Sequence, residues 1–133
     1  MREGRGTWLA ISSIDRANNK EGWWCFPPEA VVGDLVFIYQ KRKGVYRLER
    51  IISQPKYKEQ ACATRGLLTA DTLLIREFVI PVNFRKIKGD PVLSKIKGVS
   101  RRLQGTTFEV NDEQRERLIK LLSEDNPSTI RFE

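Results

Sequence analysis

The chain of 133 residues contains no histidine, one methionine and two cysteines. Without histidine, neither a Ser-His-Asp nor a Cys-His catalytic arrangement can form, and metal sites that depend on imidazole ligands are excluded. The two cysteines, Cys25 and Cys62, lie too far apart in the sequence to form a zinc-binding motif. We therefore expect no resident metal and no cofactor.

Carboxylate chemistry is the catalytic option that the missing histidine leaves open, because metal-dependent nucleases need only Asp, Glu and Lys. The sequence contains no tight acidic cluster, however. Its densest group of acids lies where acidic side chains stabilise the start of an expected helix: Glu109, Asp112, Glu113 and Glu116. The sequence therefore favours a protein that is not an enzyme.

Long apolar runs and a secretory leader are also missing. No stretch approaches the roughly 20 apolar residues of a membrane-spanning helix, and residues 1–6 lack the apolar segment of a signal peptide. We therefore expect a cytoplasmic protein with no membrane partner. Cys25 and Cys62 could pair in principle, but in that compartment we expect two free thiols.

Positive charge is what the chain has in excess, with 24 Lys and Arg against 17 Asp and Glu, a net charge of +7 and a pI near 9.7. Such an excess favours a polyanionic partner, nucleic acid first and an acidic membrane surface second. The alternative is a thermophile-like surface, rich in charged side chains of both signs, with some positive charge left over. Charge alone leaves both interpretations open.

Composition and length indicate one folded domain. With 40% hydrophobic and 31% charged residues, the chain is typical of a globular protein, and 133 residues suffice to bury a core. We assign residues 1–125 to a single domain and residues 126–133 to a tail or the start of a linker. We expect the isolated domain to be a monomer.

Hydrophobic patterns predict an α+β fold. Apolar or alternating stretches predict strands over residues 7–12, 35–39, 45–52, 73–82 and 108–110. The alternation in residues 45–52 indicates a half-exposed strand, whereas the continuous apolar run in residues 35–39 indicates burial on both faces. Between these two strands, Lys41-Arg42-Lys43-Gly44 predicts a hairpin turn in which Gly44 supplies the positive φ.

One helix is predicted near the end of the chain. Asn111 and Gln114 have the spacing of a capping box, which predicts a helix over residues 112–123. Residues 86–98 read as a basic, irregular stretch. Because the strands are mostly connected as hairpins, we expect a small mixed or antiparallel curved sheet that could close into a barrel, with helices around it.

Two adjacent tryptophans stand out in the segment Gly22-Trp23-Trp24-Cys25-Phe26-Pro27-Pro28. Successive side chains of an extended strand point to opposite faces, so the two indoles cannot both be core residues. The prolines that follow prevent a helix from absorbing the pair. One ring should pack inward, and the other is a candidate stacking surface for a flat ligand such as a base.

With these segments in place, the chain resembles the EVE domain, and more distantly the YTH domain, of the PUA-like superfamily. The similarity rests on an ordered set of motifs over residues 7–124, namely Trp8-Leu9-Ala10-Ile11, Gly22-Trp23-Trp24 and Gly33-Asp34-Leu35-Val36-Phe37-Ile38-Tyr39. It implies a PUA-like fold, a small curved sheet with helices around it. It also implies an aromatic cage that receives a flipped-out modified base.

The resemblance assigns roles to individual residues of the Trp-Trp segment and the loops beside it. Trp24 matches the cage tryptophan, while a core indole with a bonded N–H is the alternative; Trp23 is then the inward residue. The other residues that the resemblance places at the modified base are Ser13 and Asn18 on the base edge, Tyr57 as a second cage wall, and Cys25 at the border of the pocket. Ser13 and Asn18 are equally compatible with ordinary loop chemistry.

Phosphate contacts are expected from cations near the mouth of the cage. Lys41, Arg101 and Arg102 lie where the family places cations that bind the nucleic-acid backbone, and further candidates are Lys56, Lys58, Lys95 and Lys97. Each cation alone is more often simply solvated, but as a set they would produce a steep dependence of binding on salt.

The chain departs from the YTH pattern at two places. Ser12 stands where YTH domains often carry a basic residue, and Arg102-Leu103-Gln104 replaces a segment with an acidic residue. Both departures favour the EVE domain, and both leave the identity of the recognised base open.

Three functions compete at this point. The first is a non-enzymatic reader of methylated or hydroxymethylated DNA, serving as the specificity domain of a modification-dependent restriction system with a nuclease or motor partner. The second is an RNA-binding accessory domain that recognises a modified or unpaired nucleotide, as PUA-like relatives do. The third is an enzyme acting on nucleotides, as in the related ASCH group, against which the missing histidines and scattered acids count.

Overall fold

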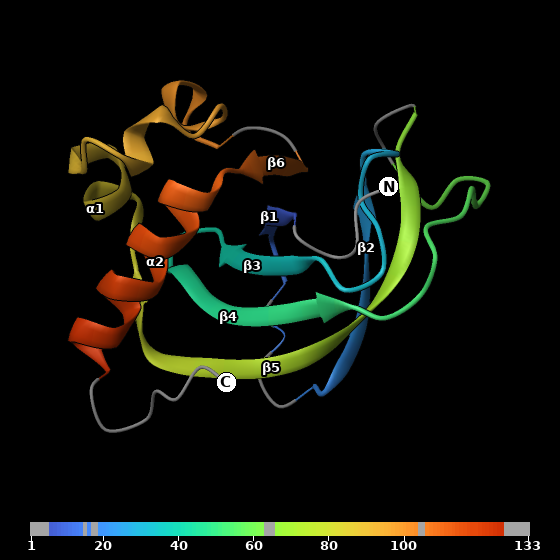
Figure 1. The fold of residues 1–133 in the computed structure, drawn as a ribbon, viewed down its shortest axis with the longest axis horizontal. Coiled ribbons are helices and arrows are strands. Elements are labelled where there is room, and N and C mark those ends of the chain that lie inside the picture. Colours follow the sequence, from blue (N-terminus) through green and yellow to red (C-terminus); the bar gives the residue numbers. More distant parts are fainter. Residues whose placement is uncertain (1–5, 15, 17–18, 63–65, 104–105, 127–133) are drawn as a thin grey trace.

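The computed structural model describes residues 6–14, 16, 19–62, 66–103 and 106–126 (Figure 1). In these ranges the chain forms six strands and two α-helices, joined partly by two short 3₁₀ turns. The strands are β1 (Thr7–Ser12), β2 (Glu21–Phe26), β3 (Leu35–Gln40), β4 (Gly44–Ile51), β5 (Leu68–Val82) and β6 (Thr107–Val110). The helices are α1 (Phe84–Gly89) and α2 (Asp112–Asp125), and the turns are Leu93–Lys95 and Val99–Arg101.

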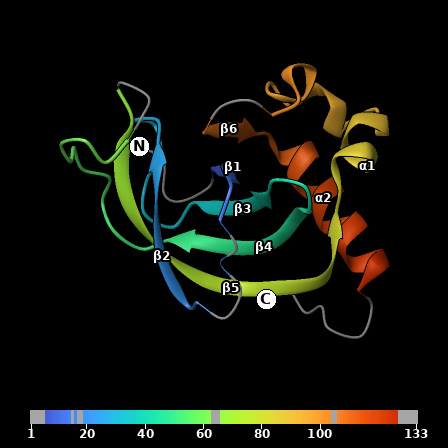
Figure 2. The ribbon, with the colours of Figure 1, turned by 180° about the vertical axis from the view of Figure 1, so that it is seen from behind.

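The strands form one mixed sheet in the order β2-β5-β4-β3-β1-β6. The β1–β3 pair is parallel and the other pairs are antiparallel. The 15-residue strand β5 pairs with β2 through its first half and with β4 through its second half, so it carries the curl of the sheet (Figures 1 and 2). The result is a curled, half-barrel sheet of the α+β class, as predicted.

The two faces of the sheet bury two separate cores. Strand β3 contributes Phe37 to one and Val36 and Ile38 to the other, because successive side chains alternate between faces. The larger core lies between the sheet and the helical segments, where α2 adds Leu118 and Leu122. The smaller core lies within the curl, with Trp24 packed against its border.

Helix α2 is anchored at both ends. The predicted capping box is present, since the Gln114 amide donates to Asn111 Oδ1 at 2.8 Å and the Asn111 amide donates to Gln114 Oε1 at 2.9 Å. At the other end, the Asn126 side chain exchanges hydrogen bonds of 2.9 and 3.0 Å with the backbone of Ile80 in β5.

Neither α2 nor the shorter α1 is long and apolar enough to cross a membrane.

Strand β4 differs from the prediction in its burial. The alternating sequence indicates half-exposure, but seven of its eight residues are buried. Arg47 and Glu49, which produce the polar half of the pattern, are buried because they pair with each other at 2.5 Å. A pattern of charges in the sequence does not reveal that the charges neutralise one another inside the fold.

Other boundaries also shift. Strand β5 begins at Leu68 rather than at residue 73, because its first half pairs with β2, an edge strand that the strand predictions omit. The stretch from residue 86 to 98, predicted to be irregular, contains most of α1 and one 3₁₀ turn. The hairpin turn is confirmed, and Gly44 has the expected positive φ of 121°.

Candidate functional site

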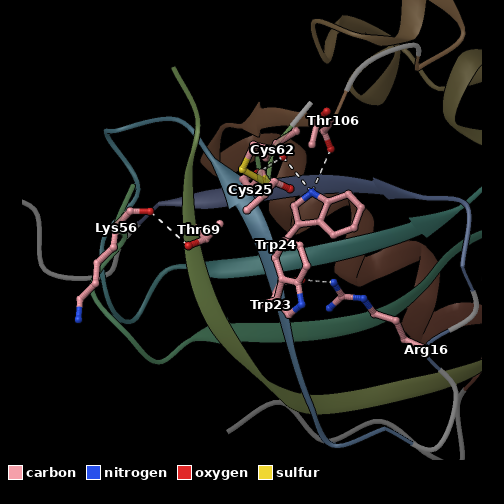
Figure 3. The surroundings of a disulfide bond; sticks show 10 residues. Arg16, Trp23, Trp24, Cys25, Lys56, Cys62, Thr69 and Thr106 are labelled. Carbon is pink, nitrogen blue, oxygen red and sulfur yellow. Dashed lines mark hydrogen bonds between the residues drawn. A yellow bond between two sulfur atoms is a disulfide. The ribbon is translucent and has the colours of Figure 1, made fainter. Parts of the chain in front are cut away.

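The two edges of the sheet meet at a seam. Strand β2 is one edge and β6 the other, and Trp24 connects them: its Nε1–H lies 3.0 Å from Thr107 Oγ1 and 3.2 Å from the Thr106 carbonyl oxygen (Figure 3). The Thr107 hydroxyl in turn donates to the carbonyl of Cys25 at 2.5 Å. The Thr107 hydroxyl therefore satisfies a backbone carbonyl of the edge strand β2.

Two pockets lie along this seam. The first, which we call the seam pocket, has a volume of about 300 Å³ and is lined by Ile11, Ser13, Trp23, Trp24, Cys25, Lys41, Ala61 and Thr106. The second, the loop pocket, has a volume of about 410 Å³ and is lined by Ser12, Ile14, Arg16, Asn19, Glu21, Gly22, Trp23 and Trp24. The Trp-Trp pair lines both, and both volumes fall in the range of small-molecule sites.

The two tryptophans face opposite sides of β2, as the strand pattern requires. Trp24 is paired with Ala70 and lies on the concave face, partly buried, whereas Trp23 is paired with Asp71 and is 50% exposed. The prediction that Trp23 points inward is therefore wrong, because the curl of the sheet places the even-numbered side chains of β2 inside. Trp24 packs against the core and has a bonded N–H, as in the alternative interpretation, and it also lines both pockets.

Arg16 forms the floor of the loop pocket beside Trp24. Its guanidinium carbon lies 5.2 Å from the centroid of the Trp24 ring, its Nη1 is 2.8 Å from Glu49 Oε1, and its Nη2 donates to the Trp23 carbonyl (Figure 3). Gly22 permits this approach, since a Cβ at that position would lie 2.8 Å from Nη1 of Arg16. Sequence reasoning missed Arg16, and only the glycine before the Trp-Trp pair could have indicated a close neighbour.

A buried ion network supports this floor. Arg47 pairs with Glu49 and, at 3.3 Å, with Glu77, and it donates to the backbone carbonyls of Arg16 (2.8 Å) and Asn19. Because Arg47 and Glu49 are each only 1% exposed, their charges depend on these partners. The network fixes the described part of the loop between β1 and β2 beneath the pocket.

The structure brings together some of the residues that the sequence predicts at the base. Trp24, Cys25 and Ser13 line the seam pocket. Tyr57 lines neither this pocket nor the loop pocket and is 77% exposed, so the loop after β4 contributes Ala61 in its place. Asn18 lies outside the described residues.

A disulfide bond joins Cys25 of β2 to Cys62 of the loop between β4 and β5 (Figure 3). The expectation of two free thiols is therefore wrong. The physical reason is long-range: β2 pairs with the first half of β5, and this brings the loop that precedes β5 back over the edge strand. The sequence distance between the cysteines does not reveal that approach.

A third pocket, which we call the basic pocket, adjoins the seam pocket and shares Lys41 with it. Its volume is about 250 Å³, and it is lined by Ile11, Tyr39, Lys41, Arg42, Phe84, Arg102 and Leu103. In the described part of the chain, none of its three cations is paired with a carboxylate. Arg42 and Arg102 both have left-handed backbones, with φ of 73° and 55°. This conformation is energetically unfavourable for residues other than glycine.

Only some of the predicted phosphate-binding cations line the basic pocket. Lys41 and Arg102 meet at the basic pocket, together with Arg42, which was not predicted. Arg101 is exposed in the adjacent 3₁₀ turn and does not line the pocket. Lys56 and Lys58 are exposed on the loop between β4 and β5, where Lys58 Nζ lies 6.0 Å from the centroid of the Trp23 ring.

Burial in the basic pocket also affects Tyr39. Loss of solvent raises the pKa of its hydroxyl above the ordinary value of about 10, so the phenol, which is neutral at physiological pH in any case, stays neutral to a higher pH. In the described ranges, no group of three or more cysteine and acidic side chains could hold a metal ion.

The Gly33-Asp34 motif has a structural role. Asp34 is fully buried and accepts hydrogen bonds from Trp8 Nε1 (2.9 Å), the Gly6 amide (2.9 Å) and the Val31 amide (3.1 Å). Gly33 has a φ of 95°, which turns the chain into β3. The motif therefore ties the start of β1 to the start of β3.

The chain is similar in structure to several solved proteins. Neither a protein-family model nor a curated protein sequence matches the chain. A crystal structure of a protein from Pseudomonas syringae is 16% identical, with a TM-score of 0.73 over 87% of this chain and 99% of that one. A hypothetical protein from Leishmania major is 18% identical (TM-score 0.69; 90% and 95% covered), and a protein from Agrobacterium tumefaciens is 16% identical (TM-score 0.69; 96% and 100% covered). Identities this low show a shared fold alone.

Proposed function

We propose that the seam pocket binds one base that has been flipped out of a nucleic-acid duplex. The observation that carries this proposal is the Trp24 indole, whose N–H edge is fixed by Thr106 and Thr107 while the ring lines two pockets. A flat aromatic surface held beside a pocket of about 300 Å³ suits a flat ligand. Stacking on such a surface contributes roughly 1–3 kcal/mol per base.

The proposed ligand is a methylated or hydroxymethylated base of DNA. Flipping costs roughly a few kcal/mol, and it exposes both the Watson–Crick edge and any added group to the protein. Ser13 and Lys41 supply polar groups in the seam pocket for that edge. This choice of ligand also follows the resemblance to the EVE domain of the PUA-like superfamily.

The surrounding charge supports a nucleic-acid ligand. The chain carries a net charge of +7, and the basic pocket gathers Lys41, Arg42 and Arg102 beside the seam pocket. We propose that these cations bind phosphates that flank the flipped base. In a cell, such a non-enzymatic domain would serve as the specificity unit of a modification-dependent restriction system, with a nuclease or motor as its partner.

A binding panel tests the proposal. Labelled DNA duplexes and RNA hairpins, unmodified or carrying 5-methylcytosine, 5-hydroxymethylcytosine or N6-methyladenine, are titrated with the protein and followed by fluorescence anisotropy. We expect several-fold tighter binding of one modified duplex than of its unmodified counterpart, because the added group contacts the pocket only when present. Tighter binding of an RNA hairpin would instead favour the RNA-binding accessory domain.

Two variants test whether the preference for a modified duplex depends on the pocket. Trp24→Ala should remove the preference for the modification, whereas Tyr57→Ala, which removes an exposed ring outside both pockets, should keep it. Circular dichroism checks that both variants are folded. Equal affinities of the wild-type chain for modified and unmodified duplexes would contradict the proposal, and turnover of a nucleotide would point to an enzyme.

A further inference from the structure

One side of the seam pocket is held by the disulfide bond. Cys25 lines the pocket from β2, and its partner Cys62 directly follows Ala61, which lines the pocket from the loop between β4 and β5. The Cys25 sulfur lies 3.8 Å from the carbonyl oxygen of Ala61. The covalent bond therefore lies directly against the pocket and determines where Ala61 sits.

The other strong attachments of this loop lie at its base, away from Ala61. Lys56 and Thr69 exchange backbone hydrogen bonds of 2.8 and 2.7 Å, and the Asp71 amide donates to Ser53 Oγ at 2.8 Å. These bonds hold the two ends of the loop to each other and to β5. They would persist without the disulfide.

Beyond Lys56 the described loop is weakly held. Residues 57–60 are exposed, and the hydrogen bond of 3.2 Å from the Ala61 amide to the Lys58 carbonyl stays within the loop. Lys58 Nζ lies 6.0 Å from the Trp23 centroid, at the outer limit of a cation–π contact. Within residues 57–62 the disulfide is thus the strongest described link to the sheet.

We propose that the Cys25–Cys62 disulfide is a redox control on the seam pocket. The oxidised chain keeps Ala61 in the pocket wall, and reduction by a low-molecular-weight thiol releases the loop and opens that wall. The proposal rests on the proposed function of the seam pocket as a ligand site, and it adds that only the oxidised chain binds the ligand tightly.

The two sulfurs differ in access, which sets the direction of the exchange. Cys25 is 6% exposed, whereas Cys62 is partly exposed. An external thiolate attacks Cys62 Sγ, the disulfide bond breaks, and its electron pair leaves on Cys25 Sγ, which takes up a proton. A second external thiolate then attacks the external sulfur of the mixed disulfide and releases Cys62 as a thiolate. Two external thiols are oxidised to one disulfide for each protein disulfide reduced.

Hydrogen exchange and binding, measured on the same samples, test the proposal. The oxidised chain is compared with the chain reduced by dithiothreitol. We expect the Ala61 amide, which donates to the Lys58 carbonyl, to exchange roughly tenfold faster after reduction, because the covalent link no longer restricts local opening of the loop. We expect the affinity for the preferred duplex to fall roughly three- to tenfold, since the wall is then formed in only a fraction of molecules.

A double variant, Cys25→Ser with Cys62→Ser, separates the disulfide from other effects of the reductant. It should exchange and bind like the reduced chain and should not respond to dithiothreitol. A single Cys62→Ser variant, altered at the more exposed sulfur, guards against misfolding of the double variant. Amides of Leu118 and Leu122 in α2 serve as an internal control and should not change.

Each alternative outcome has a definite meaning. Unchanged exchange of the Ala61 amide, or faster exchange with unchanged affinity, overturns the redox proposal. A chain that shows no preference for any modification contradicts the proposed function, yet a fall in its nucleic-acid affinity on reduction would still support the redox control. An oxidised chain that binds no nucleic acid contradicts both.

Discussion

At the scale of single residues, Trp24 combines a structural and a proposed binding role. Its N–H closes the seam through Thr106 and Thr107, and its ring lines two pockets. The sequence pattern singled out the Trp-Trp pair, because two adjacent indoles cannot both be buried. It could not indicate Thr106 or Ala61 as further lining residues, since folding brings both to the pocket from distant segments.

The two roles of Trp24 can be separated by Trp24→Phe. This change keeps an aromatic ring but removes the N–H that lies between Thr106 and Thr107, so we expect a loss of about 1 kcal/mol in the free energy of unfolding. Urea unfolding measures this loss. The preference for a modified duplex should survive in the Phe variant, and its disappearance there would mean that the hydrogen bond, not the ring, is what the ligand needs.

Glu49 is the buried carboxylate that pairs with both Arg16 and Arg47. Glu49→Gln leaves Arg47 and Arg16 without their buried carboxylate partner, so we expect about 3–5 kcal/mol of destabilisation in urea unfolding. Glu77→Gln is the matched control, because Glu77 also pairs with Arg47 but is 32% exposed, and it should cost about 1 kcal/mol or less. Equal losses in the two variants would contradict the role assigned to the network.

At the scale of elements, features that depend on neighbouring residues could be predicted from the sequence, whereas strand pairing and contacts between distant segments could not. The Asn111–Gln114 capping box identified α2 because its bonds lie within four residues. The first half of β5 was missed because it is an extension that only its pairing with β2 explains. The burial of β4 and the Cys25–Cys62 bond depend in the same way on segments far apart in the sequence.

Asp90 links three helical elements and gives a pH-dependent prediction. Burial alone would raise the pKa of its carboxyl, but hydrogen bonds from Arg117, Leu93 and Val92 outweigh burial and hold the pKa below its ordinary value. A depressed folded-state pKa contributes stability above the unfolded value of about 4, and this stability is lost as the pH falls through the folded pKa.

The variant Asp90→Asn tests the direction of this pH dependence of stability. We expect the wild-type chain to be more stable than Asp90→Asn at pH 6, and the difference in the free energy of unfolding to shrink as the pH falls below about 4. Urea unfolding at a series of pH values measures the difference. A difference that stays constant down to pH 3 would show that the carboxyl contributes through its shape and not through its charge.

At the scale of the whole molecule, the proposed site is a consequence of how the sheet curls. Residues from β2, β1 and the loops around them meet because the two edge strands approach each other, and the basic pocket lies directly alongside. The α+β class and a curved mixed sheet could be predicted from the strand patterns. The seam could not, because no local pattern specifies which two edges of a sheet will meet.

The central claim is that a flipped base stacks on Trp24, and the three tryptophans of the chain provide its most direct test. In a spectrum of the ¹⁵N-labelled protein each indole N–H gives one signal. Trp8, buried and bonded to Asp34, is the internal control. On titration with a duplex carrying 5-hydroxymethylcytosine, or whichever modification binds best, we expect the Trp24 signal to shift strongly and the Trp8 signal to stay in place. Binding of the duplex with the Trp24 signal unmoved would contradict the account.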